Sequence, residues 1–383
     1  MSTTGTVAIA GAGIAGFAAA ASFAQRGFDV TVYERSQDPR EFGAGIYLKD
    51  NSLPVLDALG VYDHIAAAGS KIDTASITDE RGEVIVRRDV SRERLIVVLR
   101  AELHNALRDA ATAAGVKLVT GKTVTGASAD GVLRFDDRTE VSADVVIGAD
   151  GVYSTVRESL GLTKSYRYLP DGATRVLIKR DGEGPEGREY WSGNRRVGVA
   201  PCGPELAYVF LIGPESNPRC GALPLDKDYW NEAFPNLGHV FDRIEPDSGV
   251  HHRHQEVTCL RWASGRVAII GDAAHAQPPN FGQGAGLSIA AAYELARTVA
   301  DGRSSADVPA QLANWESRFR PAADKVQRYT TWYSNAGYYW PRPALGLRSK
   351  FFHTLSVTPA TAHWWEFWWR GGVEAPATYL SND

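Results

Sequence analysis

The sequence is poor in sulfur-containing residues and has no long apolar run. Among its 383 residues there are three cysteines and one methionine. Cys202, Cys220 and Cys259 lie far apart and without Cys-x-x-Cys spacing, which excludes a disulfide framework or a zinc site of the usual pattern. No apolar stretch approaches the roughly 20 residues of a membrane-spanning helix, and the N-terminus lacks the basic start of a secretory signal. We therefore expect a cytoplasmic protein that does not associate with membranes.

Charge of one sign is also lacking. Lysine and arginine (41) nearly balance aspartate and glutamate (45), which leaves a formal net charge of −4. No basic stripe alternates with aromatic residues, so a nucleic-acid partner is not expected. His251, His252 and His254 lie close together, but no carboxylate or cysteine is spaced to complete a metal site with them. We expect no metal.

The N-terminal stretch has the pattern of a dinucleotide-binding β-α-β unit. Thr6–Ala10 predicts a short strand, which runs into the glycine-spaced GAGIAG and an alanine-rich helix. A second strand, 29–33, ends at Glu34, 18 residues after the last glycine. Such an acid accepts hydrogen bonds from a ribose diol and repels a 2′-phosphate. The pattern predicts adenine-dinucleotide binding, and it does not distinguish NAD from FAD.

A second glycine-rich junction lies far along the chain. Residues 267–270 predict a buried strand that ends at Gly271-Asp272, and Pro278-Pro279 then forces an extended turn. Glycines at 282, 284 and 286 open a helix, whose first backbone N–H groups have no partner inside the helix. These groups, at the positive end of the helix, would bind an anion or an electron-rich ring.

A third strand-and-turn stretch covers residues 144–157, DVVIGADGVYSTVR. Val145–Ile147 predicts a buried strand and is followed by a tight turn that carries Asp150. Thr155, with Glu158 three residues later, is typical of a helix start with reciprocal side-chain capping. The role that these residues themselves indicate for Asp150 is stabilisation of the turn.

The order of these patterns predicts a fold class. We expect an α/β protein, α+β overall, with a Rossmann-like dinucleotide-binding domain, an antiparallel β-sheet substrate domain and a helical C-terminal part. The dinucleotide-binding domain would be discontinuous (1–163 and 258–325), with a β-hairpin insertion at 73–97; the substrate domain would cover 164–257. Residues 326–383 would form a helical, aromatic-rich segment. Its tryptophan pairs at 364–365 and 368–369 have helical spacing, which suits packing or a dimer contact better than a membrane surface.

The three motifs, in this order, resemble those of the single-component FAD-dependent aromatic hydroxylases, the para-hydroxybenzoate hydroxylase class. GAGIAG with Glu34, GADGVYSTVR and GDAAHAQPPNFGQGAG all match, as does Arg100 at the start of RAELHNAL. The similarity covers roughly residues 5–330. Within the class, FGAGIYLKDN and RVGVAPC are similar to the 2-methyl-3-hydroxypyridine-5-carboxylate oxygenase branch.

The resemblance implies a tightly and non-covalently bound FAD, with NAD(P)H and O2 as co-substrates. NAD(P)H would reduce the flavin, and O2 would form a C4a-hydroperoxyflavin that transfers oxygen to an aromatic or N-heteroaromatic hydroxy acid, with or without ring opening. The implied FAD contacts are Gly11, Gly13, Gly16, Glu34, Arg35, Gly45, Arg100, Asp150, Asp272, Gly284, Ala285 and Gly286.

The resemblance also implies roles near the reacting ring. Pro279 would shape the wall beside the reacting carbon. Gln283 and His275 would order water or substrate, unless they serve only the helix start. Arg196 would bind a carboxylate and Tyr208 a ring hydroxyl, with packing or a surface position as the alternative for each. Tyr47 would contact flavin or substrate, or pack in the core.

Two other functions stay open at this point. The same fold would suit a flavin-dependent reductase or dehydrogenase that inserts no oxygen, or a non-catalytic FAD-binding redox sensor. The intact glycine junction at 282–286 argues against the sensor. We expect a small aromatic or pyridine-type substrate as the partner, and a monomer or homodimer.

Overall fold

A six-stranded, mainly parallel sheet forms the base of the computed structural model, which describes residues 5–40, 44–302 and 305–361. Its strands lie in the order β18-β19-β12-β1-β2-β8. Their bounds are β1 (Thr6–Ala10), β2 (Asp29–Glu34), β8 (Lys117–Thr120), β12 (Val145–Gly148), β18 (Ala263–Ser264) and β19 (Val267–Ile269). The parallel pairing of β1 with both β2 and β12 brings the first glycine motif beside the turn that carries Asp150.

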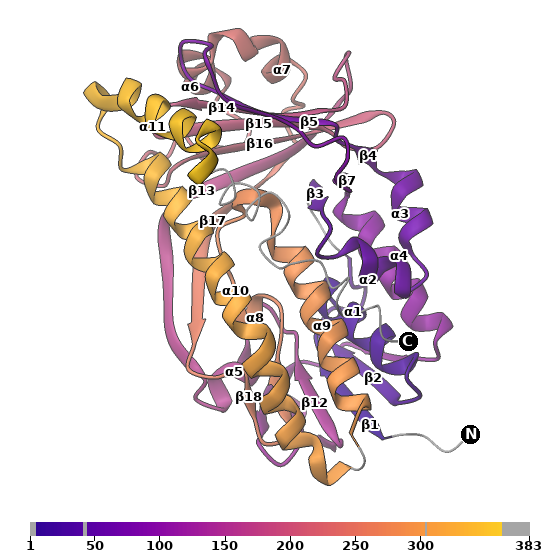
Figure 1. The fold of residues 1–383 in the computed structure, drawn as a ribbon. Coiled ribbons are helices and arrows are strands. Elements are labelled where there is room, and N and C mark those ends of the chain that lie inside the picture. The colour runs from indigo at the N-terminus through magenta and orange to yellow at the C-terminus, as the bar shows by residue number, and fades with distance from the viewer. Residues whose placement is uncertain (1–4, 41–43, 303–304, 362–383) are drawn as a thin grey trace.

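Helix α1 (Ile14–Ala24) can pack closely because many of its buried residues are alanines. Four consecutive alanines, 18–21, are fully buried. This helix packs against both α4 (Arg100–Ala113) and α9 (Gly284–Ala300), as Figure 1 shows. The shorter helices of the region are α2 (Leu53–Ala58), α3 (Tyr62–Ala68), α5 (Thr155–Ser159) and α8 (Asp272–His275).

A seven-stranded sheet lies above the first, in the order β17-β13-β16-β15-β14-β5-β6. All its pairs are antiparallel except β14 with β5. Its strands are β5 (Thr74–Thr78), β6 (Val84–Asp89), β13 (Thr163–Lys179), β14 (Glu186–Ser192), β15 (Arg195–Pro201), β16 (Leu206–Pro214) and β17 (Val250–Cys259). The expected hairpin at 73–97 is therefore present as β5 and β6, but it extends this second sheet. The domain boundaries themselves stay a prediction.

The alternation of side chains gives this second sheet two different faces. One face packs its valines and leucines against α6 (Lys227–Ala233) and α7 (Gly238–Asp242) in a separate apolar core. The opposite face carries Tyr208 and Leu177, which pack toward β3 (Gly45–Leu48) and β7 (Ile96–Leu99). Strand β7 joins β3 and β4 (Ser70–Lys71) in a small sheet, and β9 (Val124–Ser128), β10 (Val132–Phe135) and β11 (Glu140–Ser142) form another.

Helix α10 (Val308–Tyr338) runs alongside both large sheets and is followed by α11 (Leu345–Val357), as Figure 1 shows. Arg320 of α10 donates to the carbonyl oxygen of Leu260 (2.9 Å). The Gln327 side-chain amide donates to the carbonyls of Val257 (2.6 Å) and Ala276 (2.9 Å). The helix thereby connects β17 to the segment after α8. The tryptophan pairs at 364–365 and 368–369 lie outside the described residues.

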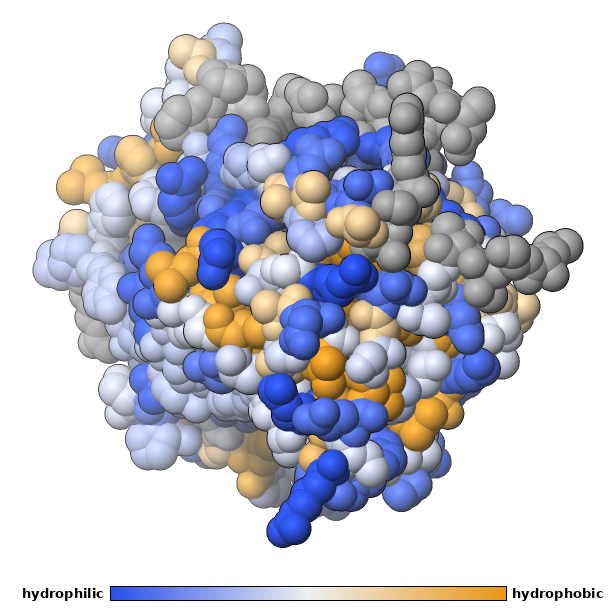
Figure 2. Space-filling model, turned by 90° about the horizontal axis from the view of Figure 1, so that it is seen from below, coloured by the Kyte–Doolittle hydropathy of each residue, from blue (hydrophilic) through white to orange (hydrophobic). Residues whose placement is uncertain are grey.

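The surface is a mixture of polar and apolar side chains. In the view from below, small apolar patches are separated by hydrophilic residues (Figure 2). Within the part of the chain that the structure describes, no helix combines the length and apolar character needed to cross a membrane.

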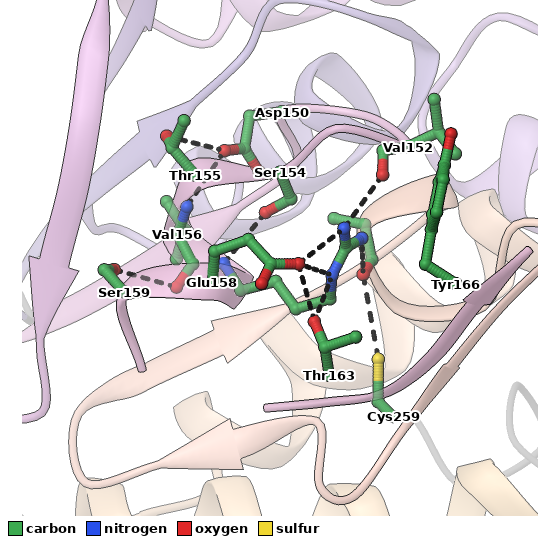
Figure 3. Close-up of polar contacts among 12 residues, drawn as sticks. Asp150, Val152, Ser154, Thr155, Val156, Glu158, Ser159, Thr163, Tyr166 and Cys259 are labelled. Carbon is green, nitrogen blue, oxygen red and sulfur yellow. Dashed lines mark hydrogen bonds and ion pairs between the residues drawn. The ribbon is translucent and has the colours of Figure 1, made fainter. Parts of the chain in front are cut away.

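The buried guanidinium of Arg157 links the turn after β12, the start of β13 and helix α8. It donates to the carbonyl oxygens of Val152 (2.9 Å) and Ala273 (3.0 Å) and to Thr163 Oγ1 (3.0 Å), and it pairs with Glu158 (3.1 Å). Figure 3 shows the Val152, Thr163 and Glu158 partners around this group. The side chain is 2% exposed, so these partners, rather than water, stabilise its buried positive charge.

Replacing this guanidinium should destabilise the fold strongly. Arg157→Met leaves two buried carbonyls without donors, and we expect a loss of about 3 kcal/mol in the free energy of unfolding, measured by urea titration. The control is Arg134→Met, which removes an exposed ion pair with Glu140 (3.0 Å), and such pairs contribute about 1 kcal/mol or less. Equal losses in the two variants would contradict the role of Arg157.

Candidate active site

The first glycine motif forms a turn that only glycine permits. Gly11 has φ +101°, and a Cβ there would collide with the carbonyl of Ala149. A Cβ on Gly16 would collide with the carbonyl of Gly11. Gly13 caps the N-terminus of α1 in an extended conformation. The turn therefore brings backbone N–H groups at the start of α1 to the end of β1, where an anion can bind.

Glu34 is directed at this glycine turn from the end of β2. Its Oε2 accepts a hydrogen bond from the N–H of Ala12 (2.9 Å), and its Oε1 accepts one from the N–H of Ser36 (2.9 Å). A carboxylate oxygen accepts more than one bond, so both remain available to a diol. Arg35 follows with an exposed side chain. Contacts of either residue with a cofactor stay predictions.

The start of α9 presents free backbone rather than side chains. A Cβ on Gly284 would meet nothing within 4 Å, and Ala285 is partly exposed. A Cβ on Gly286, by contrast, would lie 2.5 Å from the Asn51 amide oxygen. Since the first amides of a helix have no intrahelical acceptor, those of residues 284–286 can hold an electron-rich group. Asp272 is the first residue of α8, which follows β19 in the chain, and its side chain is exposed.

Asp150 has one oxygen in use and one without a partner. Its Oδ2 accepts from the N–H of Val156 (3.2 Å) and from Thr155 (3.3 Å), at the start of α5, as Figure 3 shows. Its Oδ1 is buried and has no hydrogen-bond partner. The turn-stabilising role is thus visible. A polar group of a ligand bound beside the glycine turn could donate a hydrogen bond to this second oxygen.

Two glycines make room for two tyrosine rings. A Cβ on Gly45 would lie 2.8 Å from the ring of Tyr208, and one on Gly282 would lie 2.6 Å from Cβ of Tyr47. The ring centroids of the tyrosines are 6.3 Å apart. Burial raises the pKa of both phenols above their usual value, so both keep their protons and can donate. Strands β3 and β16 and the start of α9 thereby meet at one place.

The three residues with predicted catalytic roles lie in different environments. Gln283 is buried and accepts a hydrogen bond from the Asn51 amide (3.2 Å), and Pro279 is exposed ahead of α9. His275 is buried with its ring 5.2 Å from that of Trp262, and burial lowers its pKa to about 4. No described contact joins His275 to the tyrosines. Its surroundings are those of a core residue, the alternative to an ordering role.

Arg196 is already matched by negative charge. It is 5% exposed, and its guanidinium lies 3.3 Å from Glu189 and 3.9 Å from Asp171. It also lies over the ring of Tyr333, 5.2 Å from the centroid. The side chain shares a sheet face with Tyr208, since Val197 on the next position packs in the core beneath the other face. Its role in binding a substrate carboxylate stays a prediction.

A buried polar chain joins Asp171 to the segment before α9. The Ser334 hydroxyl of α10 donates to Asp171 (3.1 Å) and accepts from the Asn280 amide (3.0 Å), which also donates to the carbonyl of Thr330 (2.7 Å). The chain fixes Asn280 beside Pro279. Sequence reasoning missed these residues, as it missed Asn51, because they come from separate elements with no characteristic spacing.

A family model for the FAD binding domain matches residues 4–330. The chain belongs to this family. The glycine turn, the open backbone at Gly284 and the unpartnered oxygen of Asp150 all suit FAD. The predicted resemblance, fold class and cofactor are thereby confirmed.

The similar proteins are FAD-dependent monooxygenases. The chain is 36% identical over 343 residues to 2-heptyl-3-hydroxy-4(1H)-quinolone synthase of Mycobacteroides abscessus, covering 85% of this chain and 88% of that one. It is 32% identical over 346 residues to the FAD-dependent urate hydroxylase of Mycolicibacterium vanbaalenii, covering 84% and 86%. The tetrameric form of 2-methyl-3-hydroxypyridine-5-carboxylic acid oxygenase superposes with a TM-score of 0.82 at 29% identity, covering 94% and 95%. The protein is an FAD-dependent monooxygenase of the hydroxylase type.

The open space at Gly284 gives a test that separates cofactor binding from folding. Gly284→Ala places a methyl group where no protein atom lies, so the thermal stability of the FAD-free protein should not fall. If FAD occupies that space, its Kd should rise about tenfold, or ~1.4 kcal/mol, in a fluorescence titration.

The control is Gly282→Ala. Gly282 has φ +60° and no room beside Tyr47, so this variant should lower the stability of the FAD-free protein by about 1 kcal/mol or more. An unchanged FAD affinity in Gly284→Ala would remove the start of α9 from the cofactor site.

Proposed function

We propose that the protein hydroxylates a small nitrogen-containing aromatic ring that carries an oxygen substituent, with NAD(P)H and O2 as co-substrates. The observation that carries the proposal is a pair of protonated phenols, the half-buried Tyr47 and the buried Tyr208, whose ring centroids lie 6.3 Å apart. Tyr47 also packs against Gly282, in the turn before α9. The names of the similar enzymes support the ring class: a quinolone, urate and a hydroxypyridine carboxylic acid are all nitrogen heterocycles with oxygen substituents.

We propose a division of the cofactor contacts along the first sheet. The glycine turn with Glu34 would hold the adenosine half of FAD, and the start of α9 would hold the flavin ring. Bound FAD supplies the redox chemistry that couples NAD(P)H and O2 to ring hydroxylation. The residues proposed to hold FAD are Gly11, Gly13, Gly16, Glu34, Arg35, Gly45, Arg100, Asp150, Asp272, Gly284, Ala285 and Gly286.

The protein itself would orient the ring and exclude water. Because both phenols stay protonated, Tyr47 and Tyr208 can donate hydrogen bonds to ring oxygens at neutral pH. Leu177, Leu99 and Phe210 pack around Tyr208 and give this corner an apolar wall. Such a wall keeps out the water that would divert reducing equivalents from the ring.

Product analysis tests the proposal. The FAD-loaded protein would be given NADH or NADPH under 18O2 with quinolones, hydroxypyridine carboxylates, urate and simple phenols. We expect one nitrogen heterocycle to stimulate coenzyme oxidation and to gain one labelled oxygen atom. Two oxygen atoms gained with loss of ring absorbance would indicate coupled ring opening. Coenzyme oxidation that no ring compound changes, with no labelled product, would instead support a reductase or a redox sensor.

A further inference from the structure

The turn before α9, residues 279–282, holds an aromatic residue in a conformation that favours glycine. Phe281 has φ +61° and ψ 5°, and it is one of two non-glycine residues with positive φ in the described part of the chain. An L side chain is strained in this left-handed region, and it keeps such a conformation only where its surroundings enforce it. Strained residues of this kind cluster at functional sites. The contacts around Phe281 therefore show what enforces the conformation of the turn.

Helix α10 holds the turn from one side. The ring of Phe281 packs against that of Tyr333, with 4.5 Å between the centroids. The side-chain amide of the neighbouring Asn280 donates to the carbonyl oxygen of Thr330 (2.7 Å) and to the hydroxyl of Ser334 (3.0 Å). Asn280 is 5% exposed, so water does not replace these acceptors if they are lost. A short stretch of α10 thus fixes both residues of the turn.

The carboxyl group of Asp171 sets the direction of the hydrogen bonds in this chain. Burial raises the pKa of this carboxyl, but its neighbours His254, Arg196 and Ser334 together bring the pKa below its ordinary value. The group is therefore a carboxylate at neutral pH, and a carboxylate only accepts hydrogen bonds. The Ser334 hydroxyl donates to it (3.1 Å), which leaves the lone pairs of that hydroxyl for the amide of Asn280. The amide cannot rotate without losing two bonds to α10.

The turn also borders the proposed site. The N–H of Gly282 donates to the carbonyl oxygen of Pro279 (3.1 Å), and a Cβ on Gly282 would lie 2.6 Å from Cβ of Tyr47. Helix α9 begins two residues later, at Gly284, the proposed binding place of the flavin ring. If Phe281 left the left-handed region, the backbone on either side would rotate, and the close contact with Tyr47 would be lost. The conformation of the turn therefore controls the packing of Tyr47.

We propose that Asp171 and Ser334 are positioning residues for ring hydroxylation: acting through Asn280, they hold the strained turn and keep Tyr47 packed against it. The proposal rests on the proposed function. Neither side chain is given a contact with FAD or with the ring, because the effect of both passes through the amide of Asn280. Loss of the Ser334 hydroxyl would release the turn, admit water and divert reducing equivalents from the ring.

Hydrogen exchange in the FAD-loaded protein tests this hold on the turn without any ring substrate. Ser334→Ala removes the hydroxyl, and Ser334→Thr keeps it. The matched control is Ser349→Ala, because the buried Ser349 of α11 donates in the same way to the buried Asp79 (2.9 Å), in the turn after β5. We expect the amides of residues 280–285 to exchange about tenfold faster in Ser334→Ala, and at the wild-type rate in the control. Asp171→Asn, which removes the charge that orients the hydroxyl, should accelerate the same amides by a smaller factor.

Turnover under 18O2, with the ring compound that the wild-type protein oxygenates, tests the catalytic consequence. We expect kcat and the fraction of coenzyme oxidation that yields labelled product each to fall about tenfold in Ser334→Ala. KM should stay within about threefold of wild type, and Ser334→Thr should recover part of the loss. In an Asn280→Ala background, Ser334→Ala should have no further effect, because the two residues act in one chain.

Three results would overturn the proposal: wild-type exchange of the turn in Ser334→Ala, an equal loss of labelled product in Ser349→Ala, or an undiminished effect of Ser334→Ala in the Asn280→Ala background. Failure of the proposed function is a different outcome, in which the wild-type protein itself yields no oxygenated ring. The role in hydroxylation then falls with that function, while the exchange rates still decide whether Ser334 holds the turn.

Discussion

The contact of backbone with tyrosine rings at Gly45 and Gly282 is the constraint on which the rest of the site depends. A single methyl group at either position would fall within 3 Å of a ring or its Cβ. Without these glycines, β3 could approach neither β16 nor the turn before α9 so closely, and the two tyrosine rings would not lie 6.3 Å apart. The arrangement places hydrogen-bond donors for a ring beside amides suited to an electron-rich cofactor.

Longer elements keep these segments in register. Strands β13 and β17 extend from the level of the first sheet into the second, and α10 lies along both (Figure 1). Buried polar contacts complete the connection: Arg157 joins the turn after β12 to α8, and Ser334 joins the Asn280 segment to Asp171. Because such groups have few alternative partners once buried, they specify the relative positions of the sheets. The site therefore depends on packing well outside its own residues.

Local sequence patterns predicted individual strands, helix starts and the fold class. They did not predict the contacts between elements that are far apart in the chain. Thr6–Ala10 is a strand with the predicted bounds, the helix predicted to open among Gly282, Gly284 and Gly286 begins at Gly284, and the fold class and family are confirmed. The pairing of β5 with β14, which carries the hairpin into the second sheet, could not be read from local patterns. Nor could the charges around Arg196, since strand register decides which side chains meet.

In the arrangement that we propose, the flavin ring binds at the start of α9 and the substrate ring binds next to it, in contact with Tyr47 and Tyr208. A crystal structure of the FAD-loaded protein with a bound substrate ring tests it most directly. We expect the flavin ring system to lie against the amides of Gly284–Gly286, with the substrate ring between the flavin and Tyr208. A substrate ring bound on the opposite face of the second sheet, near α6 and α7, would rule out this arrangement.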